Sequence, residues 1–138
     1  MAAPAAQLQH AIFSILVADP ALVAALGAPH VYDSPPKNIV SPYVTYGGTS
    51  VYDWSTGTAI ATEQLFTLHV WSKANGDAEA LGIMVLIRVR LADSLMPLGD
   101  CDPVRLRLEF FELRYEDDLA MHHGLARFRA IAEPSTGA

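Results

Sequence analysis

The chain has 138 residues, of which 51% are hydrophobic and 17% charged, and this composition excludes an intrinsically disordered protein. A chain of this length folds around one hydrophobic core, so we expect a single domain over residues 1–138. No apolar run approaches the roughly 20 residues that a membrane span needs, so a membrane protein is not expected. The net charge of −6 has the wrong sign for a protein that neutralises many phosphates, which argues against stable binding to nucleic acid.

Residues 5–26 carry apolar side chains at the spacing of one helical face, interrupted at Asp19-Pro20. Because proline suits the first turn of a helix and Asp19 can cap it, we predict a long helix, a break, and a short helix ending at Gly27. The run "AIFSILVADPALVAAL" resembles the core of a signal peptide, but no basic segment precedes it and no good cleavage site follows. A cytoplasmic product is therefore expected.

Alternating patterns predict short strands at residues 31–33 and 43–46 and a longer strand at residues 65–71. The proline-rich connection between the first two reads as a loop or a sheet edge, and Gly47-Gly48 permits a bend or a bulge. The segment "TSVYDWSTGTAIAT", which is small and polar, reads as a long hairpin tip. The stretch that opens with His30 is then scaffold that shapes a sheet, not a ligand loop.

Residues 73–95 predict a helix with Asn75 or Asp77 near its start and Pro97 after its end. Two more strands follow at residues 104–110 and 119–131, with a bulge at Phe110-Phe111 and a frayed tail over 133–138. The inward residues of the helix are predicted to be Leu81, Met84, Val85, Ile87 and Leu91. The predicted core comprises Phe66, Leu68, Val70, Leu81, Val85, Leu106 and Leu108.

No constellation of catalytic or metal-binding residues stands out. Cys101 is the only cysteine, so an internal disulfide and a cysteine-rich zinc site are excluded, and no histidine lies near it in sequence to form a nucleophile pair. Neighbouring residues of a strand point to opposite faces, so His122 and His123 are not expected to hold one metal, and His69 reads as a packed or surface histidine. We expect no enzyme, no cofactor and no metal.

Tyr52, Trp54 and Trp71 are the candidate contacts with another subunit. Tyr52 and Trp54 stand in the small, polar hairpin tip, which has no evident core for them to enter, and Trp71 ends a strand with large side chains on both faces. Large aromatic side chains are favoured in protein interfaces. Folding back onto the chain's own sheet is the alternative for the two tip residues.

The order of "LQHAIFSILVADPALVAALG", "HVYDSPPKNIVSPYVTYGG" and "TEQLFTLHVWSKANGDAEALGIMVLIRVRLAD" resembles the tail-completion or tail-terminator proteins of long-tailed bacteriophages and gene transfer agents. The resemblance extends over nearly the whole chain. Its most specific pieces are "ADPALVAAL", "VYDSPP" followed by "PYV", and "LHVWSKANGDAEA" leading into a helix. Each piece is weak alone, and the order and spacing carry the resemblance.

The resemblance implies an α+β fold in which helices pack on an antiparallel sheet, and subunits that form a hexameric ring. Such a ring caps the head-proximal end of a tail tube, stops tube growth and joins the capsid connector, without catalysis. The implied partners are the major tail tube protein and the connector or stopper proteins, with DNA only passing through the lumen, in a particle assembled in the bacterial cytoplasm. A head-completion or stopper protein, and a small-ligand-binding domain using the "YGG" bend, are the alternatives.

Overall fold

A computed structural model of the chain describes residues 4–34, 36–53, 62–99 and 101–132. These residues form three helices and one sheet. In chain order the elements are α1 (Pro4–Val17), α2 (Pro20–Leu26), β1 (Val31–Tyr32), β2 (Tyr43–Asp53), β3 (Thr62–Ser72), α3 (Ala78–Leu91), β4 (Leu95–Leu98), β5 (Cys101–Glu116) and β6 (Met121–Ala132).

The predicted break between the first two helices is confirmed. Asp19 lies between α1 and α2, and its Oδ1 accepts hydrogen bonds from the amides of Ala21 at 3.0 Å and Leu22 at 3.2 Å. The short helix α2 ends at Gly27, whose φ of 83° is readily adopted only by glycine. Of the described helices, none alone is long and apolar enough to cross a membrane, although α1 and α2 pass that test as a pair bent by 78°.

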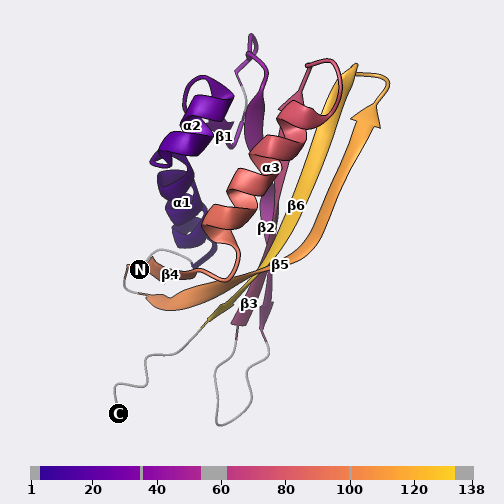
Figure 1. The fold of residues 1–138 in the computed structure, drawn as a ribbon. Helices are drawn as coiled ribbons and strands as arrows, with labels where there is room; N and C mark the ends of the chain where they lie inside the picture. Colours follow the sequence, from indigo (N-terminus) through magenta and orange to yellow (C-terminus); the bar gives the residue numbers. More distant parts are fainter. Residues whose placement is uncertain (1–3, 35, 54–61, 100, 133–138) are drawn as a thin grey trace, which may run out of the picture.

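The sheet has six strands in the order β1-β2-β3-β6-β5-β4, and the three helices lie on one of its faces (Figure 1). This arrangement confirms the α+β fold. All neighbouring strands are antiparallel except β1 and β2, which pair in parallel, so the sheet is mixed. The first part of β5 curls round and brings β4 into contact with α1 (Figure 1).

The hairpin formed by β2 and β3 is longer than the sequence predicted. Residues 49–53 continue β2, with Tyr52 opposite Glu63, although they were assigned to the hairpin tip. This part of the strand extends beyond the helices (Figure 1), so Val51 and Tyr52 are exposed and the alternation of buried side chains that marks the rest of the strand is missing. Residues 54–61, which include Trp54, lie outside the described residues.

Two of the three register shifts among the described strands lie close to predicted bulges, and the third is between Met96 and Leu98. One lies between Tyr46 and Thr49, where Gly48 has a φ of 69°. The other lies between Leu108 and Phe110, one residue before the predicted site. In a strand, the amide and carbonyl groups of every second residue point toward the same neighbouring strand. Each of these two bulges inserts one extra residue, so the residues that point to that side have even numbers before the bulge and odd numbers after it.

The core lies between the helices and the sheet. Phe66, Leu68, Val70 and Leu106 are buried as predicted, and Leu108 packs against the core while partly buried. The largest fully buried side chains are Phe66, Phe128, Leu8, Ile12, Leu16, Leu22, Leu68, Ile83, Met84, Ile87, Leu91 and Met96. Residues from both ends of the chain therefore share one core.

The prediction of which face of α3 enters the core is partly wrong. Met84, Ile87 and Leu91 are buried as expected, but Leu81 is 42% and Val85 37% exposed. The buried side also contains Ala80 and Ile83. The helix carries its own apolar side chains on all sides, so the sequence pattern does not select one face for burial. Packing against the sheet decides which face is buried.

The end of α3 also differs from the prediction. The helix covers Ala78–Leu91 instead of residues 73–95, and Asp93 adopts a φ of 61° that turns the chain. Residues 95–98 then form the edge strand β4. Proline is tolerated there because an edge strand leaves one row of backbone amides without a partner strand.

Candidate interface sites

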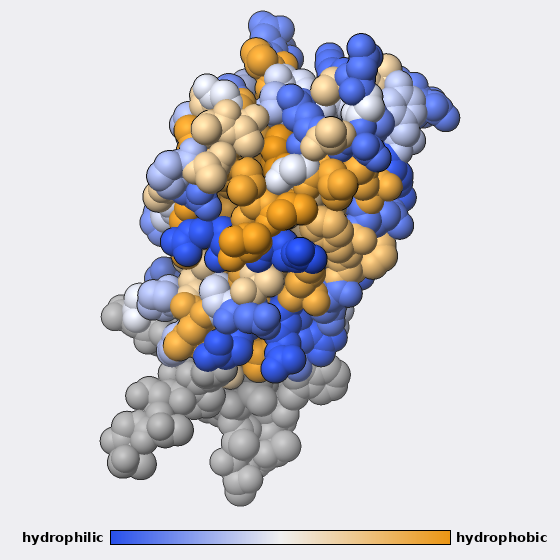
Figure 2. All heavy atoms as spheres, viewed as in Figure 1, coloured by the Kyte–Doolittle hydropathy of each residue, from blue (hydrophilic) through white to orange (hydrophobic). Residues whose placement is uncertain are grey.

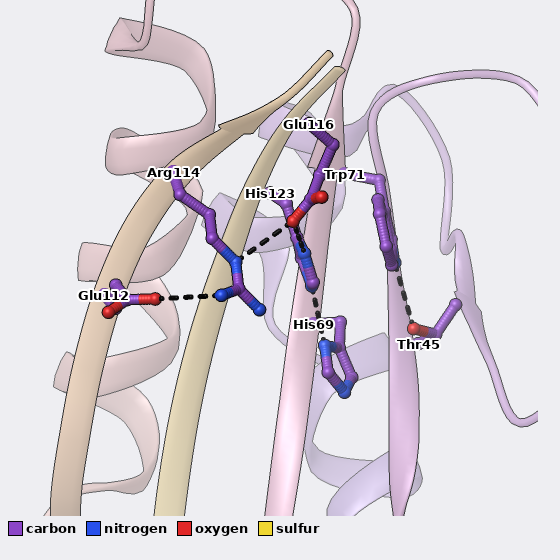
Figure 3. Close-up of polar contacts among 7 residues, drawn as sticks. All are labelled: Thr45, His69, Trp71, Glu112, Arg114, Glu116 and His123. Atoms are coloured by element: carbon purple, nitrogen blue, oxygen red, sulfur yellow. Dashed lines mark hydrogen bonds and ion pairs between the residues drawn. The ribbon is translucent and has the colours of Figure 1, made fainter. Parts of the chain in front are cut away.

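The face of the sheet opposite the helices carries a connected group of aromatic and charged side chains (Figure 3). Odd-numbered residues of β3 point to this face, since the even-numbered Phe66, Leu68 and Val70 point into the core. Trp71 and His69 on β3 lie beside His123 on β6, because the register places Trp71 opposite His123. Two strands therefore bring these residues together, although His69 and His123 are 54 positions apart in sequence.

Trp71 is held mainly by contacts within the subunit. Its ring stacks on His123 with centroids 3.9 Å apart and planes inclined by 10°. The indole Nε1 donates a hydrogen bond to Thr45 Oγ1 at 3.1 Å (Figure 3). The ring also stacks on Tyr43. Trp71 thus covers His123, which is only 6% exposed.

A chain of hydrogen bonds runs from His69 through His123 to Glu116. His123 Nδ1 lies 3.0 Å from Glu116 Oε1, and His123 Nε2 lies 2.7 Å from His69 Nδ1. An ionised Glu116 only accepts, so His123 donates from Nδ1, which leaves its Nε2 to accept the proton of His69 Nδ1. Arg114 pairs with the same Glu116 oxygen at 3.0 Å. All donors and acceptors agree when both histidines are neutral.

The surroundings shift two pKa values in the same direction. Burial lowers the pKa of His69, and the neighbouring His123 and Arg114 lower it further. The hydrogen bond from His123 lowers the pKa of Glu116, with a further contribution from the charge of Arg114. Both shifts favour neutral His69 beside ionised Glu116, and the hydrogen bonds are compatible with that state.

A polar hollow of about 410 Å³ lies on the same face, beside the bulge between Tyr46 and Thr49. Its lining residues come from β2, β3 and β6, and they are Gly47, Gly48, Thr49, Ser50, Tyr52, Leu65, Thr67 and Arg127. Gly47 separates the hollow from His69, since a Cβ atom there would lie 2.5 Å from His69 Nε2. Only glycine therefore fits beside the histidine pair.

The family model of the tail completion protein gp17 matches residues 10–133. The chain belongs to this family. Among solved structures, a chain in the "Virion of native gene transfer agent (GTA) particle" is similar, with 28% sequence identity and a TM-score of 0.85. The match covers 97% of this chain and 100% of that one. No curated protein sequence matches.

Membership of the tail completion family confirms the recognition made from sequence and gives the chain a structural role in a phage-type tail. Among the described residues, the histidine pair is joined by a hydrogen bond to the Glu116 carboxylate, with Trp71 stacked on His123 and Gly47 beside His69. Within those residues no three histidine, cysteine or acidic side chains are arranged to hold a metal.

The candidate contacts named from sequence do not form one site in this tail completion protein. Tyr52 is 42% exposed and lies opposite Glu63, whereas Trp71 is half-buried and pairs with Tyr43 at the other end of the same hairpin. Trp54 lies outside the described residues. Their interface role stays a prediction.

The sequence analysis missed the pairing of His69 with His123. The strand register that joins them depends on which strands become neighbours, and no local pattern in the sequence encodes it. His122 and His123 were expected to point to opposite faces and not to share a metal, and only His123 points toward His69. His122 faces the other side and contacts Tyr115.

We expect this tail completion protein to lose stability as the pH falls below neutrality. The pKa of His69 is lowered from its ordinary 6.5, so the unfolded chain binds a proton at a higher pH than the folded chain does. Stability therefore falls as the pH drops through 6.5. The lowered pKa of Glu116 adds a second loss as the pH drops below its ordinary 4.5.

Thermal unfolding at a series of pH values from about 8 to about 5 measures the effect of His69. The variant His69→Gln should unfold with a flatter dependence of Tm on pH in that range. His10→Gln is the control, because His10 is exposed on α1. An unchanged pH dependence in His69→Gln would show that the titrating group lies elsewhere.

Proposed function

We propose that the protein forms a hexameric ring that caps the head-proximal end of a phage-like tail tube. The ring ends the addition of tube subunits and presents the surface that joins the capsid connector. The observation that carries this proposal is the family match over residues 10–133, together with the likeness to a chain of a gene transfer agent virion. The likeness spans both chains almost completely, so it concerns the whole domain.

The proposed partners are further copies of the chain, the major tail tube protein and the connector or stopper proteins. The mature protein would then lie at the neck of the particle after assembly in the bacterial cytoplasm. With a net charge of −6, the ring is suited to let DNA pass without holding it. Tyr52 and Trp54 remain candidate contacts with a ring neighbour or with the tube.

Two measurements on particles test the proposal. Inactivating the gene should release capsids without joined tails and tails of uncontrolled length, because nothing ends tube growth. A tagged copy should be found by electron microscopy as a ring of six at the head-proximal tail end. Tails of normal length that merely fail to join would indicate a stopper protein, and another ring number would overturn the hexamer.

A further inference from the structure

Strands β5 and β2 each have one edge that a neighbouring strand covers over only part of its length. The part without a neighbouring strand is called the open edge. β4 accompanies β5 from Cys101 to Arg105, and Asp93 and Ser94 continue the hydrogen bonds to Leu106. From residue 107 to residue 116, no described strand pairs with that edge of β5. Likewise β1 pairs with β2 only at Val44 and Thr45, which leaves residues 46–53 without a second neighbour among the described strands.

The backbone groups on the open edge of β5 follow from its known hydrogen bonds. Leu106 directs both its amide and its carbonyl away from β6, toward Ser94 and Asp93. Such groups alternate along an antiparallel strand, and the bulge after Leu108 shifts the alternation by one residue. Phe111, Leu113 and Tyr115 therefore direct their amides and carbonyls to the open edge.

An apolar groove lies beside this edge, on the helix side of the sheet. It measures about 420 Å³ and lies between the start of α3 and the end of β5. Leu81 lines it from the helix, 42% exposed, and Leu113 and Tyr115 line it from the strand, Tyr115 being 53% exposed. Figure 2 shows apolar side chains gathered on the surface over α3. A strand added to β5 would therefore lay alternate side chains into this groove.

The open edge of β2 has the matching features. The amide of Val44 donates to His30 on the β1 side, and the bulge after Tyr46 shifts the alternation from even to odd residues. Thr49, Val51 and Asp53 therefore direct their backbone groups outward. Val51 lies opposite Gln64, which faces the helix side, and the Val51 side chain is 54% exposed. An apolar side chain thus extends from this edge on the side where the groove lies.

We propose that the open edge of β5 in one copy pairs with the open edge of β2 in the next copy, with Val51 entering the neighbour's groove between Leu81 and Tyr115. The intervening strands alternate in direction, so β2 and β5 run in opposite directions and the new pair is antiparallel. Three residues on each strand, centred on Leu113 and Val51, supply the main-chain groups. This inference rests on the proposed ring and names the surface that closes it.

The positions of the two open edges make the contact staggered. Across the sheet, the part of β2 that pairs with β1, at Val44, is level with Leu113 in the open part of β5. The part of β5 that pairs with β4, at Arg105, is level with Tyr52 in the part of β2 beyond β1. The two open edges can therefore meet only if neighbouring copies are offset along the strands. Closing a sheet into a barrel requires such an offset, with strands tilted by roughly 35–45° to the axis. A contact between two different edges also generates a ring when the rotation closes.

Disulfide trapping in assembled particles tests the pairing directly. In a Cys101→Ser background, the chain carries Val51→Cys with either Leu113→Cys or Tyr115→Cys, and mild oxidation should give a ladder of covalent oligomers that reaches six chains. Each cysteine alone should give no ladder, because different edges meet. A ladder from a single cysteine would overturn the pairing. So would the absence of a ladder in both double variants, and if particles still carried a ring of six at the tail end, the proposed function would stand.

Two matched pairs of variants test the same contact without crosslinking. Val51→Pro removes an amide that the subunit's own ladder does not use and should abolish ring formation in a folded chain, whereas Val51→Thr retains the amide and should assemble. Leu81→Asp should abolish assembly, whereas Val89→Asp, at a side chain 74% exposed farther along α3, should not. Circular dichroism checks that each variant folds. Folded Val51→Pro and Leu81→Asp chains that still form rings would overturn the proposal.

Discussion

Replacing Phe66 by alanine should lower the free energy of unfolding by about 3–5 kcal/mol, the usual cost of deleting a buried phenylalanine ring. Phe66 is 1% exposed and lies in the middle of an aromatic stack across three strands. Its ring stacks on Tyr46 at a centroid distance of 5.5 Å and on Phe128 at 5.4 Å. Phe13 of α1 meets Tyr46 edge-on at 5.8 Å, so the stack also joins a helix to the sheet.

The stack is well shielded from water. Burial raises the pKa of Tyr46 to about 12, against a smaller opposing effect of its hydrogen bond with Thr49. Deleting the central ring would leave a cavity that neighbours on three strands and a helix can only partly fill. Denaturant unfolding followed by circular dichroism measures the loss, and the midpoint should fall without a large change in the slope.

Phe110→Ala is the matched control for this experiment. Phe110 is 42% exposed on the other face of the sheet, where its ring lies 5.8 Å from the guanidinium carbon of Arg127. Its truncation should cost about 1 kcal/mol or less, since little apolar area returns to water. If Phe66→Ala were no more damaging than Phe110→Ala, the stack would not be the centre of the core.

Local signals in the sequence were enough where one residue type decides the backbone. Asp19-Pro20 and Gly27 set the ends of α2 because a cap, a fixed φ and a positive φ each act within one turn of helix. The alternation around Phe66 and Leu68 also predicted the buried face of β3, because every second side chain of a strand points to the same face. Such features depend on neighbours in sequence, and they could be predicted without knowledge of the fold.

Features that depend on neighbours in space could not be predicted in this way. The buried face of α3 depends on which part of the sheet lies beneath it, and the extension of β2 to Asp53 depends on pairing with β3. The contact of His69 with His123 depends on the register of β3 with β6. The open edges of β2 and β5 follow from the strand order, and the resemblance to a family implied a ring without indicating which surfaces close it.

Met84 of α3 packs directly on Gly124 of β6, and this contact supplies the second large effect. A Cβ atom at Gly124 would overlap the sulfur of Met84 and lie 2.9 Å from its Cγ. Met84 is fully buried, so its side chain cannot move aside into solvent. Gly124→Ala should therefore cost about 1–3 kcal/mol of unfolding free energy through overpacking, although alanine normally suits a strand better than glycine does.

A double-mutant cycle separates this clash from a backbone effect. Met84→Ala alone should cost about 2–5 kcal/mol because it leaves a cavity. In the double variant Gly124→Ala/Met84→Ala the added methyl occupies part of the space that the shorter side chain vacates. The combined loss should then be smaller than the sum of the single losses by about 0.5–3 kcal/mol, as expected for residues in contact. Strictly additive losses would mean that Gly124 is required for the strand conformation, and that the approach of α3 to the sheet does not depend on it.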